Sequence, residues 1–378
     1  MRNPFQYGGV VRGSAFCNRT QEIRDLVRAA ENAEKLFIYS ERRMGKTSLV
    51  LHALGTLPRH AYTTAYVDLW PSDGAASFVT ATAKAIAESI GSTAEQVLKA
   101  AKEFFGQLTP SVTLDEQGKP KVTFGLTRTS SASPQLEQVL GAPAEIASRG
   151  KKRVVVIFDE IQRILEYESD TVERQLRSII QRHEAVSYLF LGSRKHLIQK
   201  MFLDRSRPLY RSAGHYPLGP IDARHWVPFI SKKFRESGKA IPEDVTASVG
   251  EHTGGHPFYT QHLCHALWEL CEPGKAVTQP MLREAVQVLL KRETYAYTAL
   301  WESLTLSQRR LLMGLASEEE RSTKVFSSAF LQRYGLASAS SAQRAAESLT
   351  GRDVIDRDNG SLVVADRFFR IWIRQMQS

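Results

Sequence analysis

The chain has 378 residues, of which 42% are hydrophobic and 24% are charged, and this composition is typical of a globular protein of roughly two to three domains. No apolar run approaches the roughly 18 residues of a membrane-spanning helix, and the opening stretch MRNPFQYGGVVRG has no apolar signal core, so we expect a cytoplasmic protein without a membrane partner. The net charge of +10, from 50 basic and 40 acidic side chains spread along the chain, permits a nucleic-acid partner without demonstrating one.

The first predicted elements are a helix and a strand. Residues 1–35 indicate a loop followed by one helix, in which Ile23, Leu26 and Ala30 recur at helical spacing. The stretch LFIYSERRMGKTSLVL, residues 36–51, then indicates a short apolar strand, a loop and a second helix. The chemistry of the chain is organised around this loop.

The loop carries Gly45, Lys46, Thr47 and Ser48, the second half of a phosphate-binding loop. A nucleoside triphosphate needs backbone N–H groups aimed at it, a lysine at its outer phosphates and a hydroxyl on magnesium. These residues supply such groups at the right spacing, and the following helix adds the positive end of its dipole. The pattern therefore predicts a site for a nucleotide and Mg²⁺. A chance GKT in a basic turn is the competing explanation.

One position departs from the full signature, because Ser40 stands where glycine is usual. Glycine serves where a turn needs a positive φ, so the loop either turns without one at Ser40 or is strained there. We interpret Arg42 and Arg43 as a solvated edge that attracts the anion, with direct phosphate contact as the alternative. Arg43 and Met44 are kept among the candidate nucleotide-binding residues.

The next predicted elements are a strand at residues 62–69 and an alanine-rich helix at residues 77–90. The pattern then breaks over residues 108–133, where two short strands flank Gln117-Gly118-Lys119, a turn typical of a hairpin. We interpret this segment as an insertion in the nucleotide-binding domain.

The run VVVIFDE predicts a central strand, because parallel strands covered on both faces are continuously apolar. Asp159 and Glu160 stand at its carboxyl end, where open α/β sheets place their ligands. A helix is predicted from Glu173 to His183, and residues 188–191 indicate another strand, which ends in Gly192-Ser193-Arg194. Alternating strands and helices predict an α/β fold, a parallel P-loop NTPase sheet with helices on both faces.

Beyond Pro217 the strand signal fades. Residues 221–295 indicate several helices, broken at Gly238, at Gly254-Gly255 and at Pro273-Gly274, which we interpret as a helical lid.

The remaining residues, from Leu304, predict a winged helix. The amphipathic stretch LSQRRLLMGLA and the segment from Ser338 to Leu349 indicate helices, and a hairpin follows with its turn at Asp358-Asn359-Gly360. DRFFRIWIRQM closes the chain as a helix with an apolar face. The expected domains are thus a core at 1–220 with the insertion at 108–133, a lid at 221–300 and a winged helix at 301–378.

Asp159 and Glu160 are the natural partners of Lys46 and Thr47. One carboxylate, which we assign to Asp159, must hold magnesium alongside the Thr47 hydroxyl, and Glu160 can orient or deprotonate the attacking water. The alternative is a domain that only binds nucleotide, with Glu160 as a solvated cap.

Ser193 and Arg194 follow the next strand and are expected beside the γ-phosphate, which Arg194 could sense or stabilise in the transition state. The alternative for Arg194 is an arginine in solvent. Arg205, Arg207 and Arg211 cluster further on. If subunits pack head to tail, one of them, with Arg211 as our candidate, could act as an arginine finger, whereas the alternative is a solvated face.

The chain has three cysteines, Cys17, Cys264 and Cys271, which argues against a disulfide framework. Cys264 and Cys271 lie near His262 and His265 on a predicted helix. A metal site is possible there, but we favour buried small residues beside solvated histidines.

Taken in order, five stretches of the chain resemble the ATPases of the AAA+-related STAND group, archaeal and bacterial members of the P-loop class that also holds origin-recognition initiators. NPFQYGGVVRGSAF with NRTQEI resembles the N-terminal nucleotide-entry motif, and YSERRMGKTSL and VVVIFDEIQ resemble the phosphate loop and the magnesium strand. FLGSR and GGHPF resemble the group's strand ending in a hydroxyl residue and arginine and its Gly-x-Pro lid motif. The resemblance covers nearly the whole chain.

The resemblance implies an AAA+-like ATPase that hydrolyses ATP to ADP and phosphate and whose oligomeric state follows the nucleotide. It also implies that Arg19 and Glu22 match the entry motif, and that His256 and Pro257 of the lid contact the nucleotide. The choice of adenine over guanine rests on this resemblance alone.

Two main functions compete. The first is an ATP-driven switch associated with double-stranded DNA through the winged helix, where phosphates could be contacted by Arg333, Arg344, Arg352 and Arg357. Its weakness is that Glu347, Asp356 and Asp358 interrupt the basic face. The second is a regulatory or defence switch whose winged helix docks a partner protein. A third, passive nucleotide-binding protein would require that Glu160 does not catalyse.

Overall fold

The computed structural model describes residues 2–106, 108–115, 118, 120–125, 132–150, 152–318, 324–358 and 360–377. The chain forms two compact units. The core unit comprises Arg19–Arg42 and Lys46–Leu218, and the C-terminal unit comprises Met1–Asn18, Arg43–Gly45 and Gly219–Ser378.

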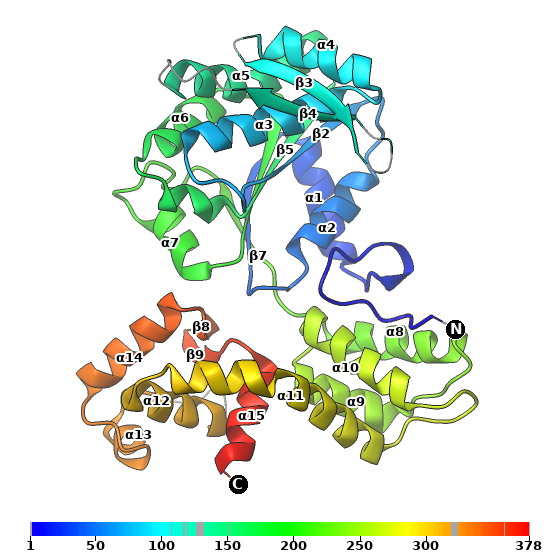
Figure 1. The fold of residues 1–378 in the computed structure, drawn as a ribbon, viewed down its shortest axis with the longest axis vertical. Helices are drawn as coiled ribbons and strands as arrows, with labels where there is room; N and C mark the ends of the chain where they lie inside the picture. Colours follow the sequence, from blue (N-terminus) through cyan, green and yellow to red (C-terminus); the bar gives the residue numbers. More distant parts are fainter. Residues whose placement is uncertain are drawn as a thin grey trace. The chain divides into compact units, whose positions relative to one another are not determined.

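The core unit is built on a five-stranded sheet with strand order β2-β5-β6-β1-β7 (Figure 1). Its strands are β1 (Lys35–Tyr39), β2 (Tyr62–Asp68), β5 (Arg153–Asp159), β6 (Val186–Gly192) and β7 (Gly214–Pro217). Every neighbouring pair is parallel, so the carboxyl ends of all the strands share one edge of the sheet. The predicted parallel α/β sheet is confirmed, and the short strand β7, which the sequence did not indicate, extends it beside β1.

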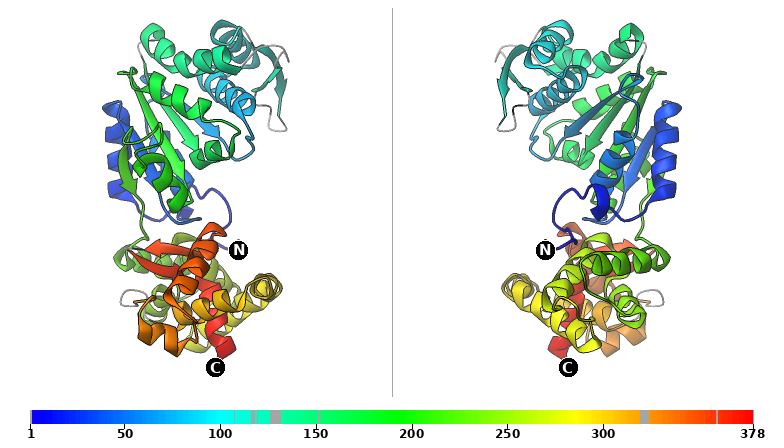
Figure 2. Two further views of the ribbon diagram at one scale, coloured as in Figure 1. Left: turned by 90° about the vertical axis from the view of Figure 1, so that its left-hand side faces the viewer. Right: turned by 90° about the vertical axis from the view of Figure 1, so that its right-hand side faces the viewer.

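Helices cover both faces of the sheet, which is why β5 is apolar along its length (Figure 2). Val154, Val156 and Phe158 enter the core shared with α3, α5 and α6, whereas the alternate residues Val155 and Ile157 are buried on the opposite face. The helical elements of this unit are α1 (Thr20–Glu31), α2 (Lys46–Gly55), α3 (Ala75–Ile90), α4 (Ala94–Phe104), α5 (Ala132–Gly150), η2 (Ile161–Glu166), α6 (Thr171–Ile180) and α7 (Lys195–Leu203).

The predicted insertion contains an antiparallel hairpin of β3 (Thr109–Leu114) and β4 (Pro120–Gly125). Its inner face is anchored by Val122 and Phe124, and the Phe124 ring packs edge-on against Phe105 at 5.8 Å between centroids. The hairpin is thereby confirmed. Two residues of its predicted turn, Gln117 and Lys119, lie outside the described residues.

The C-terminal unit is a helical layer followed by a helix-rich segment with a two-stranded hairpin (Figure 1). The N-terminal residues before Asn18, which include the one-turn helix η1 (Gly13–Ala15), pack here, and the Phe5 ring lies 5.3 Å from Phe234. The other elements are α8 (Ala223–Glu236), α9 (Glu243–Thr253), α10 (Pro257–Leu270), α11 (Gln279–Glu302), α12 (Leu306–Ser317), α13 (Ser328–Arg333), α14 (Ala339–Gly351), β8 (Ile355–Asp358), β9 (Ser361–Val364) and α15 (Arg367–Gln377).

The predicted breaks between the lid helices are confirmed. Gly238, Gly254 and Gly274 all have positive φ, and Gly254 caps the end of α9 in the left-handed conformation. Pro257 is the first residue of α10, an ordinary helix start.

The lid and winged-helix segments share one hydrophobic core, and α11 runs through the expected boundary at residue 300 to end at Glu302. The division into three domains therefore stays a prediction. Asn359 of the second hairpin turn lies outside the described residues. Among the described residues, no helix combines the length and the apolar character needed to cross a membrane.

Candidate functional site

The strand order brings the predicted site residues to one edge of the core sheet. Because β6 lies between β1 and β5, Ser193 at the end of β6 stands between the loop after β1 and the Asp159-Glu160 pair after β5. Register reinforces this, since Phe158 pairs with Phe190, and both strands end at nearly the same level.

The loop after β1 has a glycine at a position with positive φ, where glycine is favoured. Gly45 has φ of 86° and Arg43 has φ of 60°, whereas Ser40 does not adopt a positive φ. The substitution of serine for glycine at position 40 therefore causes no backbone strain. Lys46 opens α2, and its Nζ lies 2.8 Å from the buried Ser40 Oγ and 3.1 Å from the Glu41 carbonyl oxygen.

Thr47 and Asp159 lie side by side, as magnesium binding requires. The Thr47 hydroxyl donates to Asp159 Oδ2 at 2.7 Å, and the Tyr66 hydroxyl donates to the same oxygen at 2.6 Å. The backbone N–H of Glu160 donates to Asp159 Oδ1 at 2.9 Å. Burial and the charge of Asp159 raise the pKa of Tyr66, so this phenol remains a donor. A hydroxyl beside a buried carboxylate is a donor set that fits Mg²⁺.

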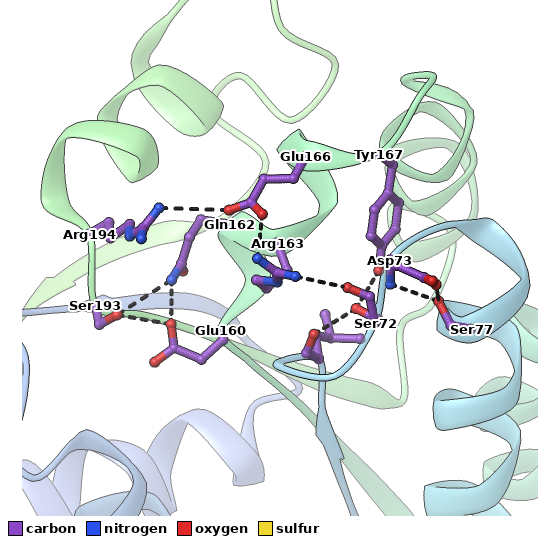
Figure 3. A network of polar contacts seen from close by, with 11 residues as sticks. Ser72, Asp73, Ser77, Glu160, Gln162, Arg163, Glu166, Tyr167, Ser193 and Arg194 are labelled. Carbon is purple, nitrogen blue, oxygen red and sulfur yellow. Dashed lines mark hydrogen bonds and ion pairs between the residues drawn. The ribbon is translucent and has the colours of Figure 1, made fainter. Parts of the chain in front are cut away.

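Glu160 is held by two side chains, one from Ser193 at the end of β6 and one from Gln162 in η2 (Figure 3). Its Oε2 accepts a hydrogen bond of 2.9 Å from Ser193 Oγ and another from Gln162 Nε2. Glu160 is in the left-handed conformation, with φ of 55°, and precedes η2 without capping it through its side chain. The carboxylate is thus tied to its neighbours and is not a solvated cap.

Arg194 belongs to a chain of polar contacts along the same edge (Figure 3). Its guanidinium lies 3.6 Å from Glu166, which also pairs with Arg163. Arg163 in turn donates to the carbonyl oxygen of Ser72 at 3.3 Å, and Tyr167 donates to Ser72 Oγ at 2.6 Å. Arg194 is therefore oriented by an ion pair and is not an arginine in free solvent.

The other candidate nucleotide residues have these positions. Arg19 is buried with φ of 72° and pairs with Glu22 at 2.8 Å. Met44 and Ser48 are buried, and the exposed Arg43 stacks over the ring of Phe258 at 4.4 Å. His256 is buried and precedes Pro257 at the start of α10. The contacts of these residues with a nucleotide stay predictions.

The arginine run after α7 divides into two kinds of residue. Arg207 forms an ion pair with Glu173, which is 1% exposed, so it is bound to the fold of its own unit and is not simply part of a solvated face. Burial raises the pKa of Glu173 despite the Arg207 charge. Arg205 and Arg211 are exposed, and Arg211 has a positive φ of 50°.

Arg333 and Arg352, two of the winged-helix arginines proposed as phosphate contacts, bind to side chains of their own unit. Arg333 pairs with Glu318 at 2.6 Å and Arg352 donates to Ser303 Oγ at 2.7 Å. Arg344 and Arg357 are exposed. On α14, Arg344 shares the exposed surface with Glu347, and the side chain of Asp358 in the wing lies outside the described residues.

The cysteine and histidine group carries no metal site among the described residues, where no cluster of three or more ligand-type side chains occurs. Cys264 and Cys271 are buried, as expected. The expectation that the histidines are solvated is wrong for His262, which is buried and stacks on Tyr7 at 4.0 Å. Burial lowers the pKa of His262 to about 4.

The sequence did not reveal Tyr66, Gln162 or Glu166 as site residues. Tyr66 was part of a predicted strand, and Gln162 follows Glu160 within VVVIFDEIQ. Only the strand register, which pairs Asp68 with Asp159, brings Tyr66 within reach of that carboxylate.

Comparison with protein families gives two matches. Residues 16–263 match a family described as an ATPase domain predominantly from Archaea. Residues 295–375 match a probable winged helix domain. A comparison with curated proteins gave no significant match.

Solved structures share the fold. A Walker-type ATPase of Pyrococcus abyssi is similar with a TM-score of 0.67 and 18% identity, over 98% of this chain and 99% of that one. The ORC2 protein of Aeropyrum pernix, solved as ADPNP-ADP complexes, has a TM-score of 0.53 and 15% identity, over 95% of this chain and 94% of that one.

Proposed function

Because the chain belongs to the family of ATPase domains found predominantly in Archaea, we propose that it binds ATP, hydrolyses it to ADP and phosphate, and acts as a nucleotide-controlled switch of the AAA+/STAND type. The observation that carries this proposal is the contact of 2.7 Å between Thr47 and Asp159, with Lys46 and Glu160 next to them in the chain. The core, lid and winged helix are proposed at 1–220, 221–300 and 301–378.

In this proposal the nucleotide is bound by the loop between β1 and α2 and by the first residues of α2. The backbone at Gly45 and the helix N-terminus present N–H groups to the phosphates, and Lys46 Nζ exchanges its bonds to Ser40 and Glu41 for phosphate oxygens. Thr47 and Asp159 would hold Mg²⁺, which when bound neutralises charge on the phosphates. Arg19, His256 and Pro257 are proposed as further nucleotide contacts on the basis of the sequence resemblance.

Hydrolysis is catalysed, in this proposal, by residues at the carboxyl ends of β5 and β6. Glu160 orients the attacking water and accepts its proton, while Asp159, held by Thr47 and Tyr66, stays a ligand and not a base. Ser193 and Arg194 face the charge that develops on the γ-phosphate. We propose Arg211, which is exposed on its own subunit, as the finger that acts on a neighbouring subunit in a nucleotide-dependent homo-oligomer.

For the winged helix we propose association with double-stranded DNA, supported by the family match at residues 295–375 and by the exposed Arg344 and Arg357. A specific observation favours docking of a partner protein as the second candidate. Arg333 and Arg352 are engaged internally, and Glu347 offsets Arg344 on α14, so the basic surface is small.

The first test measures steady-state ATP turnover and ATP binding in parallel. We expect Lys46→Ala to weaken binding, and Glu160→Gln to keep binding while it lowers kcat by about 10²- to 10⁴-fold, the usual contribution of a general base. Lys35→Ala, at the opposite end of β1, is the matched control for Lys46. Turnover that survives in Glu160→Gln would contradict the assigned base.

The second test adds duplex DNA over a range of salt. If the winged helix binds phosphates, affinity falls steeply with salt, and Arg344→Ala or Arg357→Ala lowers the salt slope by about one unit each. Lys291→Ala on α11 is the exposed control. Indifference to DNA, with a protein that co-purifies through the winged helix, would favour the second candidate.

A further inference from the structure

Gln162 is a buried amide that no part of the proposed chemistry has yet used. It is 2% exposed, and it lies two residues beyond Glu160 in η2. The left-handed turn at Glu160 reverses the chain so that the Gln162 side chain returns to the end of β6. There its Nε2 donates to Glu160 Oε2 and lies 3.4 Å from Ser193 Oγ (Figure 3).

The two donors engage the same oxygen of the carboxylate. In the described part of the chain, the bonds from Gln162 and Ser193 both fall on Oε2 of Glu160, which leaves Oε1 to accept a proton. A carboxylate with one anchored oxygen has a fixed orientation, and this suits a general base, which must meet the attacking water in one geometry.

Stability alone does not account for this amide. Among the described residues Gln162 Oε1 is buried without a hydrogen-bond partner, which is costly for an amide oxygen. Room for it exists because residue 192 is glycine, where an added Cβ would lie 2.8 Å from Gln162 Oε1 and 1.8 Å from Ile198 Cδ1. A leucine would fill the same buried volume without an unpartnered acceptor, so the distinctive contribution of the amide is the hydrogen bond from its Nε2 to Glu160.

We propose that Gln162 is a positioning residue for Glu160, which together with Ser193 fixes the carboxylate in the orientation that activates water. This inference rests on the proposed ATP hydrolysis. In this proposal Gln162 acts through Glu160, to which its Nε2 donates.

The test compares the ATP affinity and the kcat of Gln162→Leu with those of the wild type. We expect ATP affinity within about threefold of the wild type and kcat lower by about 10- to 100-fold, the effect of a loosened catalytic group. A merely structural role would not separate kcat from ATP affinity in this way. Gln175→Leu is the matched control, since Gln175 on α6 also buries an unpartnered Oε1 but lies outside this network.

Gln162→Glu is a second variant, which keeps the shape of the side chain if the leucine variant does not fold. Its carboxylate has no hydrogen to donate to Glu160 and repels it, so kcat should fall while ATP affinity stays within about threefold of the wild type. An active wild type with kcat unchanged in both variants would overturn the positioning role alone. A faster variant would also overturn it, because the network would then restrain Glu160. A wild type that binds ATP without turnover would instead refute the proposed hydrolysis itself.

Discussion

The ion pair between Arg207 and Glu173 gives a sharp prediction about stability. Glu173 is 1% exposed on α6 and Arg207 is 23% exposed, so Arg207→Ala would leave a carboxylate buried without its partner. Breaking a buried pair in this way typically costs 3–5 kcal/mol. Since Arg207 is partly solvated, we expect a loss at the lower end of this range, about 3 kcal/mol in the free energy of unfolding at pH 8.

The pH dependence follows from the raised pKa of Glu173, whose first cause is burial. A carboxyl group with a higher pKa in the folded state binds its proton more tightly there than in the unfolded chain. Its contribution to stability therefore falls as the pH rises above the unfolded pKa of 4.5. Removing Arg207 raises the folded pKa further, so the deficit of Arg207→Ala should be smaller at pH 5 than at pH 8.

Urea unfolding at both pH values, followed by circular dichroism, measures this deficit. Arg211→Ala is the matched control, because that exposed arginine belongs to the same run and should change stability by less than about 0.5 kcal/mol. The double variant Arg207→Ala with Glu173→Gln should recover part of the loss, since no charge is left buried. A deficit below about 0.5 kcal/mol for Arg207→Ala, or one that grows towards pH 5, would refute the reasoning.

Two further predictions concern single positions. The first is that Gly45→Ala destabilises the loop by about 1–2 kcal/mol, because Gly45 has φ of 86°, and weakens ATP binding in a titration. Gly55→Ala at the end of α2 is the control, since Gly55 has no positive φ and the substitution should leave ATP affinity unchanged. The second prediction is that His262→Phe reduces the loss of stability on acidification. Burial, with smaller effects of His265, Arg292 and Arg43, lowers the pKa of His262 to about 4. Because this histidine stays neutral in the folded state while it is protonated in the unfolded chain, the wild type should lose about 2 kcal/mol of unfolding free energy between pH 6.5 and 5. Thermal unfolding at those two pH values, with the exposed His60→Phe as control, would count against this account if His262→Phe kept the full wild-type dependence.

The sequence predicted the sheet where apolar runs are long and motifs are strong. The run VVVIFDE appears as β5, and LFIYSERRMGKTSLVL appears as β1, the loop and α2. Short segments of mixed composition were not predicted. Strand β7 spans only Gly214–Pro217, contains glycine and proline, and is defined by its pairing with β1. Likewise α7 was hidden because its apolar residues precede a basic, proline-containing stretch that indicates a loop.

The candidate site was predictable to the level of strand ends but not of side-chain bonds. Because the carboxyl ends of parallel strands lie at one edge of a sheet, the sequence predicted that Asp159 and Ser193 lie close together. The bonds of Glu160 to Ser193 and Gln162 depend on a left-handed backbone at Glu160, which no local pattern indicates for a glutamate. The same limit applied to Arg207, whose buried partner Glu173 is 34 residues away in the chain.

Internal bonds also explain why the sequence alone overestimates the basic surface of the winged helix. A net charge counts every arginine equally, but an arginine whose guanidinium is bonded to its own fold must break that bond to reach a phosphate. Arg370 donates to the carbonyl oxygens of Ala316 and Glu318 at the end of α12, as Arg333 does to the carboxylate of Glu318. Helix α14 then presents Arg344 together with Glu347. Arg344 and Arg357 are exposed, so the salt slopes of their alanine variants test the proposed binding of this segment to DNA against docking of a partner protein.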